Sequence, residues 1–342
     1  MAVMLVGSVG SGVGASGSLD CLPSPAETAA LGQRAGAFEN LRTLHLGVNG
    51  DLVVEQAFNG ASVQSAANIK SASKTLMAAI TGAAIQRGII SDVNERIAGS
   101  FAALLPRDPD PRLGQITVDH LLSMRAGLAR TSGANYGAWV ASDHWVRSAL
   151  AQPVQAAPGQ GMRYSTGNTH LLSALLEKRT GQPSYALGNT WFAPAGIRVM
   201  SWMDDPQGIA FGGNKVAMRP RSLFALGELY RRDGVTADGQ RLLPPGWVAA
   251  SWQIRGRSRW TGDGYGYGWF IREFAGYAGY YGWGYGGQML YVIPALELTA
   301  VITSNPNNPS GRTGYRDQLH GYLTQWARRI GAAQKNCTLA RH

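Results

Sequence analysis

A helix that is apolar on nearly every face limits how this chain can fold. Residues 72–87 predict it, because apolar side chains recur at Leu76, Met77, Ala79, Ile80, Ala83, Ala84 and Ile85. A helix of this kind is covered by protein on most of its faces. Gly88 is well placed to end it, since glycine is the usual residue just past a helix C-terminus. The fold must therefore hold this helix in its interior.

Ser71 and Lys74, at the start of this helix, carry the strongest chemical signal in the chain. Their spacing puts a hydroxyl and an amine on one helical face, beside the free N–H groups and the positive dipole end of the helix. Lysine, with a pKa near ~10.4, is a poor base at neutral pH until desolvation lowers that value. The spacing alone is common by chance, but at the start of a buried helix it predicts a nucleophile beside a proton acceptor.

Two later segments extend this signal. Tyr164 follows a turn at Pro158 and precedes a leucine-striped helix that ends at Gly181. Its phenol is expected to share proton transfer with Lys74, and the alternative is a tyrosine packed in a loop. Between positions 282 and 288 glycines alternate with aromatic residues. A glycine-bearing strand there would offer a backbone N–H to an oxyanion hole, and the alternative is an aromatic edge strand that glycines allow to bend.

The order of elements predicts an α+β fold. Residues 41–58 read as a hairpin around Asn49-Gly50, a strong turn signal. Few strand signals follow until three late segments and a terminal amphipathic helix: 265–271, 289–293, 298–304 and 315–330. This order favours an antiparallel sheet flanked by helices, with an inserted, mostly helical lobe. We expect residues 21–95 and 233–342 to form the α/β lobe and residues 96–232 the helical lobe.

Composition excludes several classes of function. The 342 residues carry a net charge of +10, but the basic residues are spread along the chain, which indicates a solvated surface rather than a nucleic-acid site. No apolar run reaches the roughly 18 residues that a membrane span needs. The six histidines lack metal-ligand spacing, so no metal site is expected. Residues 1–20 read as a possible signal segment or a flexible leader, although the basic start of a signal is missing.

The only two cysteines, Cys21 and Cys337, stand at opposite ends of the chain. They are either unrelated thiols or a disulfide that joins the termini, which often lie close together in a domain. Such a bond would fit a periplasmic or secreted protein, and a cytoplasmic location is the alternative.

The segments at Ser71–Lys74, Tyr164–Asn168 and Gly282–Gln288 occur in an order that resembles the serine β-lactamase and penicillin-binding-protein superfamily. The class C-like branch, with its β-lactamase-fold carboxylesterases and 6-aminohexanoate-dimer hydrolases, is the most similar part. The resemblance covers about residues 40–330, and three further stretches fit that branch: 116–124, 211–214 and 286–294.

The resemblance implies a role for each matching residue. Ser71 would be the acylated nucleophile, Lys74 and Tyr164 would move its proton, and the backbone N–H groups of Ser71 and Tyr285 would form the oxyanion hole. No cofactor is implied, the partner is a small ester or amide, and the oligomeric state stays open. The residues that would contact substrate are Thr166, Asn168, Trp283, Gly284 and Gly286.

Two departures from the family pattern shape the expected specificity. Thr166 stands where the second motif has asparagine, and Gly282 stands where the third motif has a lysine that contacts the substrate carboxylate. Arg163 or Arg312 would have to supply a cation from elsewhere. The sequence therefore predicts a serine hydrolase of small esters or amides. A true β-lactamase or D-alanyl peptide hydrolase is the first alternative, and a catalytically weak binding or sensor protein the second.

Overall fold

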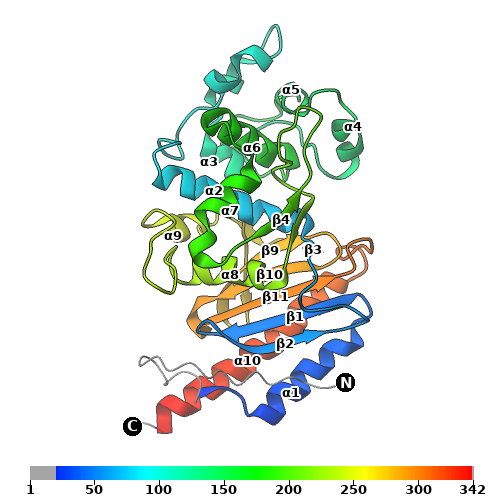
Figure 1. Cartoon of the computed structure of the whole chain (residues 1–342). Helices are drawn as coiled ribbons and strands as arrows, with labels where there is room; N and C mark the ends of the chain where they lie inside the picture. The colour runs from blue at the N-terminus through cyan, green and yellow to red at the C-terminus, as the bar shows by residue number, and fades with distance from the viewer. Residues whose placement is uncertain (1–20, 341–342) are drawn as a thin grey trace.

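A computed structural model describes residues 21–340, and its centre is one antiparallel sheet (Figure 1). The strands run in the order β2-β1-β11-β10-β9-β8-β7-β6, so the sheet brings both ends of the chain together. Their bounds are β1 (Leu41–Val48), β2 (Asp51–Ala57), β6 (Gly256–Arg257), β7 (Gly264–Tyr265), β8 (Phe270–Phe274), β9 (Tyr277–Gly284), β10 (Gln288–Ile293) and β11 (Leu298–Ser304). The hairpin predicted around Asn49-Gly50 is confirmed as β1 and β2.

Helices cover both faces of this sheet, which confirms the predicted α+β class. Helices α1 (Pro25–Arg34) and α10 (Tyr315–Ala340) lie on one face, and α2 (Ser73–Gln86) and α8 (Pro220–Arg231) on the other (Figure 1). Strand β10 shows the two-residue alternation that this requires. Its odd-numbered residues from 289 to 293 pack with α10, and Leu290 and Val292 pack with α2 and α8.

Helix α2 is as central as its composition predicts. Every residue from Ser73 to Ala84 is buried, and the helix contacts β9, α6 (Thr166–Thr180) and α7 (Ser184–Trp191). Gly88 follows it with a φ of +68°, the left-handed conformation that ends helices. The start of α2 therefore lies where the sheet meets the helices of residues 98–191.

The helical part of the chain stands above the sheet in Figure 1. Its helices are α3 (Val118–Leu122), α4 (Tyr136–Val140), α5 (Trp145–Leu150), α6 and α7, and α9 (Trp247–Ser251) follows α8. A small second sheet joins β3 (Ala67–Asn68), β5 (Val216–Met218) and β4 (Val199–Trp202). Helix α8, which the predicted boundary at residue 232 assigns to the helical lobe, packs instead on β10 and β11.

Two predicted elements differ from the structure. The single strand expected over 265–271 is wrong: β7 ends at Tyr265 and β8 begins at Phe270. Between them Gly268 has a φ of +76° and packs on α2, where a Cβ atom would come within 2.9 Å of Ala78 Cβ, so the chain turns here. The terminal helix continues past Ile330 to Ala340.

The two chain ends of the described region are joined by a disulfide between Cys21 and Cys337, whose Cα atoms lie 5.4 Å apart. The bond links the segment before α1 to the last turns of α10. The leader predicted over residues 1–20 lies outside the described residues. Within residues 21–340, no helix is both long enough and apolar enough to cross a membrane.

Candidate active site

Ser71 lies in a single 3₁₀ turn (Lys70–Ala72) that leads into α2. Lys70 has a φ of +50°, an uncommon left-handed conformation for a residue with a side chain, and its N–H donates to Asn68 Oδ1 at 3.0 Å. Ser71 is only half-buried, whereas Ser73 and Lys74 behind it are buried. The turn thus presents the Ser71 hydroxyl on the accessible side of a closely packed helix start.

Lys74 is held in place from three sides. Its Nζ lies 3.2 Å from Ser71 Oγ, 3.3 Å from Thr166 Oγ1 and 2.6 Å from the Gly213 carbonyl oxygen. The side chain is 1% exposed, and this burial lowers the pKa of Lys74 to about 7. At neutral pH a large fraction of this amine is therefore uncharged and able to accept the Ser71 proton.

Tyr164 lies beside Ser71 and Lys74. Lys74 Nζ lies 5.0 Å from the centre of the Tyr164 ring, and the phenol is near enough to Ser71 for a hydrogen bond between them to influence its pKa. Burial raises the pKa of Tyr164, although the bond to Ser71 opposes this shift. The phenol therefore keeps its proton at neutral pH, so Lys74 is the better base and Tyr164 can relay a proton between the groups beside it.

Gly282 of β9 faces the start of α2, where a Cβ atom would approach Thr75 Oγ1 to 2.6 Å. Thr75 is itself fixed, because its hydroxyl donates to the Gly268 carbonyl at 2.7 Å. A side chain at position 282 would therefore press on this fixed hydroxyl. Glycine suits the close packing of β9 on the start of α2.

Gly284 brings the backbone of β9 against the Ser71 turn. A Cβ atom here would clash with the Ile69 carbonyl and lie 3.0 Å from Lys70 Cβ. This close approach brings the end of β9, just before Tyr285, against the turn that carries Ser71. The arrangement suits an oxyanion hole made of the N–H groups of Ser71 and Tyr285. The Tyr285 side chain is 51% exposed.

An aromatic wall borders this site. Phe270 stacks on Tyr164 with ring centres 6.0 Å apart, and the ring centre of Trp283 lies 6.0 Å from that of Phe270. Trp283 is half-buried and donates from Nε1 to Ser310 Oγ at 3.2 Å, which fixes its ring. The border of the site on this side is therefore formed by aromatic rings.

The cation beside the third segment is Arg316, which the sequence did not indicate. Its guanidinium lies 5.0 Å from the Trp283 ring and donates to Asp317 Oδ1 at 2.7 Å. Of the two arginines expected as substitutes, Arg163 hydrogen-bonds to residues of its own loop, and Arg312 is exposed. The one sequence signal for a contact between Arg316 and Trp283 is the position of Arg316 in the first turn of the terminal helix.

The other residues predicted to contact substrate lie in different environments. Thr166 takes the place of an asparagine amide, since its hydroxyl meets both Lys74 and Ser132 Oγ, the latter at 2.8 Å. Asn168 is buried in α6, and within the described chain its side chain forms no hydrogen bond to Lys74. Gly286 serves the turn between β9 and β10, with a φ of +87°. Ser132 was missed because it lies in none of the segments singled out in the sequence. Gly213 lies in the 211–214 stretch, but that stretch did not indicate that its carbonyl would meet Lys74.

No grouping of three histidine, cysteine or acidic side chains suited to a metal ion occurs among residues 21–340. Separately, the groups that the structure brings together around Ser71 are its hydroxyl, the Lys74 amine, the Tyr164 phenol and backbone N–H groups. Together these groups can form and break an acyl bond to Ser71.

Comparisons with known proteins identify the family and the fold of this chain. The sequence model of the Beta-lactamase family matches residues 28–323. A candidate 6-aminohexanoate-dimer hydrolase from Bacillus anthracis superposes with a TM-score of 0.67 at 18% identity, over 86% of this chain and 82% of that one. EstCE1, a hydrolase with promiscuous acyltransferase activity, gives a TM-score of 0.68 at 18% identity, over 87% and 98% of the two chains.

A candidate beta-lactamase from Bacteroides dorei DSM 17855 gives a TM-score of 0.71 at 13% identity, over 90% of this chain and 99% of that one. At such identities these likenesses show a shared fold. The search of curated proteins finds no significant match. Because the family match spans most of the sequence and the fold agrees with it, this chain belongs to the Beta-lactamase family.

Proposed function

We propose that this protein is a serine hydrolase that acts on small neutral esters or amides through an acyl-enzyme on Ser71. One observation carries the proposal: a buried lysine whose pKa is lowered to about 7 lies 3.2 Å from a half-buried serine hydroxyl. An unshifted lysine would hold its proton at neutral pH and could not serve as a base. A structural lysine has no need of such an environment.

The geometry supports a two-step reaction. Ser71 Oγ bonds to the substrate carbonyl carbon while its proton passes to the Lys74 amine, directly or through the Tyr164 hydroxyl. The N–H groups of Ser71 and Tyr285 hold the oxyanion. The intermediate then collapses: the bond to the leaving group breaks, and the proton held by Lys74 moves to the departing alcohol or amine. Water repeats the sequence on the acyl carbon, releases the acid and returns the proton to Ser71.

The preference for neutral substrates rests on the third segment. Gly282 offers no side chain to a carboxylate, and Trp283 presents an aromatic surface in its place. The charge of Arg316 is partly balanced by Asp317. The names of two structural relatives, a candidate 6-aminohexanoate-dimer hydrolase and the hydrolase EstCE1, fit amide and ester substrates.

A true β-lactamase or D-alanyl peptide hydrolase is the competing function, and the observation in its favour is Arg316, which would have to turn toward a substrate carboxylate. A weak binder or sensor is less well supported, because such a protein has no need of the lysine–tyrosine pair. We also propose export to a periplasmic or extracellular compartment, since the disulfide between Cys21 and Cys337 requires oxidising conditions.

The test compares kcat/KM for p-nitrophenyl butyrate with that for a chromogenic cephalosporin, using Ser71→Ala as the control. The proposal expects the ester to be favoured and both activities to be lost in the control. A cephalosporin favoured by tenfold or more would overturn the neutral-substrate proposal and point to Arg316. Ester turnover that survives in Ser71→Ala would overturn the mechanism.

A further inference from the structure

His170 and Asp205 form a fully buried pair behind the proposed site. His170 Nε2 lies 2.9 Å from Asp205 Oδ2, and neither side chain is exposed to solvent. Burial of such groups is unfavourable unless they are paired. Packed aromatic rings of Trp139, Trp145 and Phe211 surround the imidazole, so it cannot reach a substrate at Ser71.

The second oxygen of this carboxylate shapes the loop between β4 and β5. Asp205 Oδ1 accepts the backbone N–H groups of Gln207 at 2.8 Å and Ile209 at 2.9 Å. Burial opposes the charge of Asp205, but the bond from His170 and these N–H groups outweigh it and lower the pKa of the carboxyl. The carboxylate thus connects helix α6 to the loop that follows residue 205.

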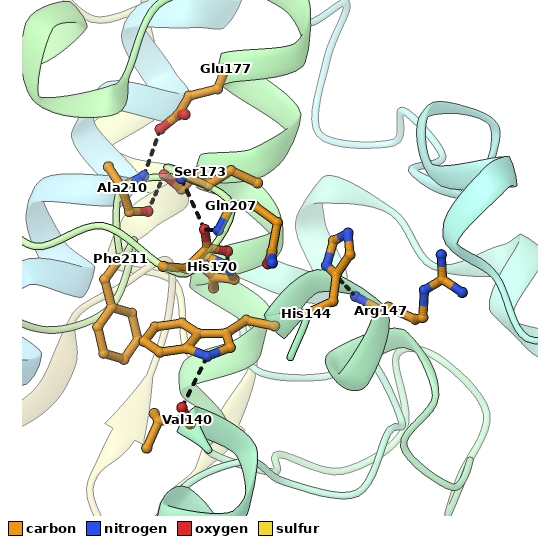
Figure 2. Close-up of polar contacts among 12 residues, drawn as sticks. Val140, His144, Arg147, His170, Ser173, Glu177, Gln207, Ala210 and Phe211 are labelled. Carbon is orange, nitrogen blue, oxygen red and sulfur yellow. Dashed lines mark hydrogen bonds and ion pairs between the residues drawn. The ribbon is translucent and has the colours of Figure 1, made fainter. Parts of the chain in front are cut away.

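Two more side chains on the same face of α6 hold this loop, as Figure 2 shows. Ser173 Oγ donates to the Ala210 carbonyl at 2.7 Å, and the Ala210 N–H donates to Glu177 Oε1 at 2.9 Å. Positions 170, 173 and 177 share a face because they are three and four residues apart. The loop is therefore fastened along two turns of α6.

The loop ends on the proposed catalytic lysine. Phe211 fills the aromatic cage, with its ring centre 4.7 Å from that of Trp145. Gly212 and Gly213 then pack directly on Thr169, where a side chain on either would clash. The Gly213 carbonyl accepts from Lys74 Nζ at 2.6 Å, the shortest of the three hydrogen bonds of that amine.

We propose that the His170–Asp205 pair is a positioning device for Lys74, which fixes the 205–213 loop so that the Gly213 carbonyl stays on the lysine amine. Without the pair the loop loses its attachment at residue 205 and keeps only those at residues 210–213, so the Gly213 carbonyl is held less firmly on Nζ. His170 and Asp205 are positioning residues, since neither contacts the reacting atoms. The expected change in kcat rests on the proposed function, whereas the positioning of the Lys74 amine does not.

Two substitutions separate the hydrogen bond from packing. His170→Phe keeps an aromatic ring in the cage but removes the donor, whereas His170→Gln keeps an N–H near the Nε2 position and removes the ring. The matched control is His45→Gln, which affects another fully buried histidine paired with a carboxylate, Glu55, at 3.1 Å in the sheet. All assays are run at a temperature well below the lowest thermal unfolding midpoint of the variants. The concentration of active sites is determined by titration with a fluorophosphonate.

The kinetic readout is kcat for p-nitrophenyl butyrate per titrated site. We expect His170→Phe to lose about 10- to 100-fold in kcat with little change in KM, as misplaced catalytic groups do. His170→Gln is expected to keep most of the activity, and His45→Gln all of it. A His170→Phe variant more active than His170→Gln would overturn the inference, because packing rather than the hydrogen bond would then matter.

A crystal structure of His170→Phe gives a readout that needs no substrate. Displacement of the Gly213 carbonyl from Lys74 Nζ by 1 Å or more supports the inference, and an unchanged contact overturns it. If wild-type protein hydrolyses no ester and takes up no fluorophosphonate, the proposed function fails, while this structural comparison still decides whether the pair positions the lysine.

Discussion

Replacement of Lys74 by methionine should make the protein more stable and inactive. The amine is 1% exposed, and burial lowers its pKa from 10.5 to about 7. In the unfolded chain Lys74 keeps its proton up to about pH 10.5, whereas in the folded protein it releases the proton above about pH 7. Between these values the unfolded state binds more protons, so this group makes the free energy of unfolding rise with pH.

The magnitude follows from the shift. One pKa unit corresponds to about 1.4 kcal/mol, so between pH 6 and pH 9 the Lys74 contribution to the free energy of unfolding should rise by about 3 kcal/mol. Lys74→Met lacks this contribution. The free energy of unfolding of Lys74→Met should therefore exceed that of wild type most at pH 6, and this difference should be about 3 kcal/mol smaller at pH 9. The variant also loses the hydrogen bond to the Gly213 carbonyl, but that loss is the same at every pH.

Urea unfolding of both proteins at pH 6, 7.5 and 9 measures this difference, and subtraction removes the titration of all other groups. In the same pH range, wild-type kcat should rise to a plateau with a midpoint near pH 7, because only the uncharged amine accepts the serine proton. Unfolding free energies that stay parallel for the two proteins would refute the view that Lys74 is buried with a lowered pKa.

Three further outcomes are expected. Lys74→Ala and Tyr164→Phe should each lower kcat by orders of magnitude, but the loss in the double variant should be far smaller than the product of the two single losses, because the effects of residues that act as one unit do not add. A loss equal to that product would show that the two residues act independently. Gly284→Ala should reduce kcat at least tenfold, because the added Cβ would clash with the Ile69 carbonyl beside the proposed oxyanion hole. The control Gly321→Ala has open space around it, and equal kcat values for the two variants would show that β9 does not shape the oxyanion hole. Native protein made in an oxidising compartment should show no free thiol when titrated under denaturing conditions without reductant, and two thiols would contradict the disulfide and the proposed export.

The elements that could be predicted from sequence are those whose signals are local. The hairpin around Asn49-Gly50 follows from two residues able to adopt a positive φ, and both do so in the structure. The buried helix α2 follows from its composition. The pairing of Ser71 with Lys74 needs only helical spacing, and the structure places their polar atoms 3.2 Å apart.

The features that could not be predicted depend on contacts between distant segments. The Gly213 carbonyl meets Lys74 across 139 positions, and a backbone acceptor has no signature in sequence. His170 and Asp205 are 35 positions apart and lie in no shared motif. Position 282 reads as a missing lysine, and its close packing against Thr75 became visible only in the structure.

Trapping of the acyl-enzyme analogue tests the central claim most directly. Native protein is treated with a fluorophosphonate at pH 8, digested and examined by mass spectrometry, with Ser71→Ala and Lys74→Met as controls. The account predicts a single phosphonylated peptide with the label on Ser71, none in Ser71→Ala, and labelling slowed by orders of magnitude in Lys74→Met. Label on another residue, or equal labelling rates in wild type and Lys74→Met, would contradict the claim that Lys74 activates Ser71 as the nucleophile.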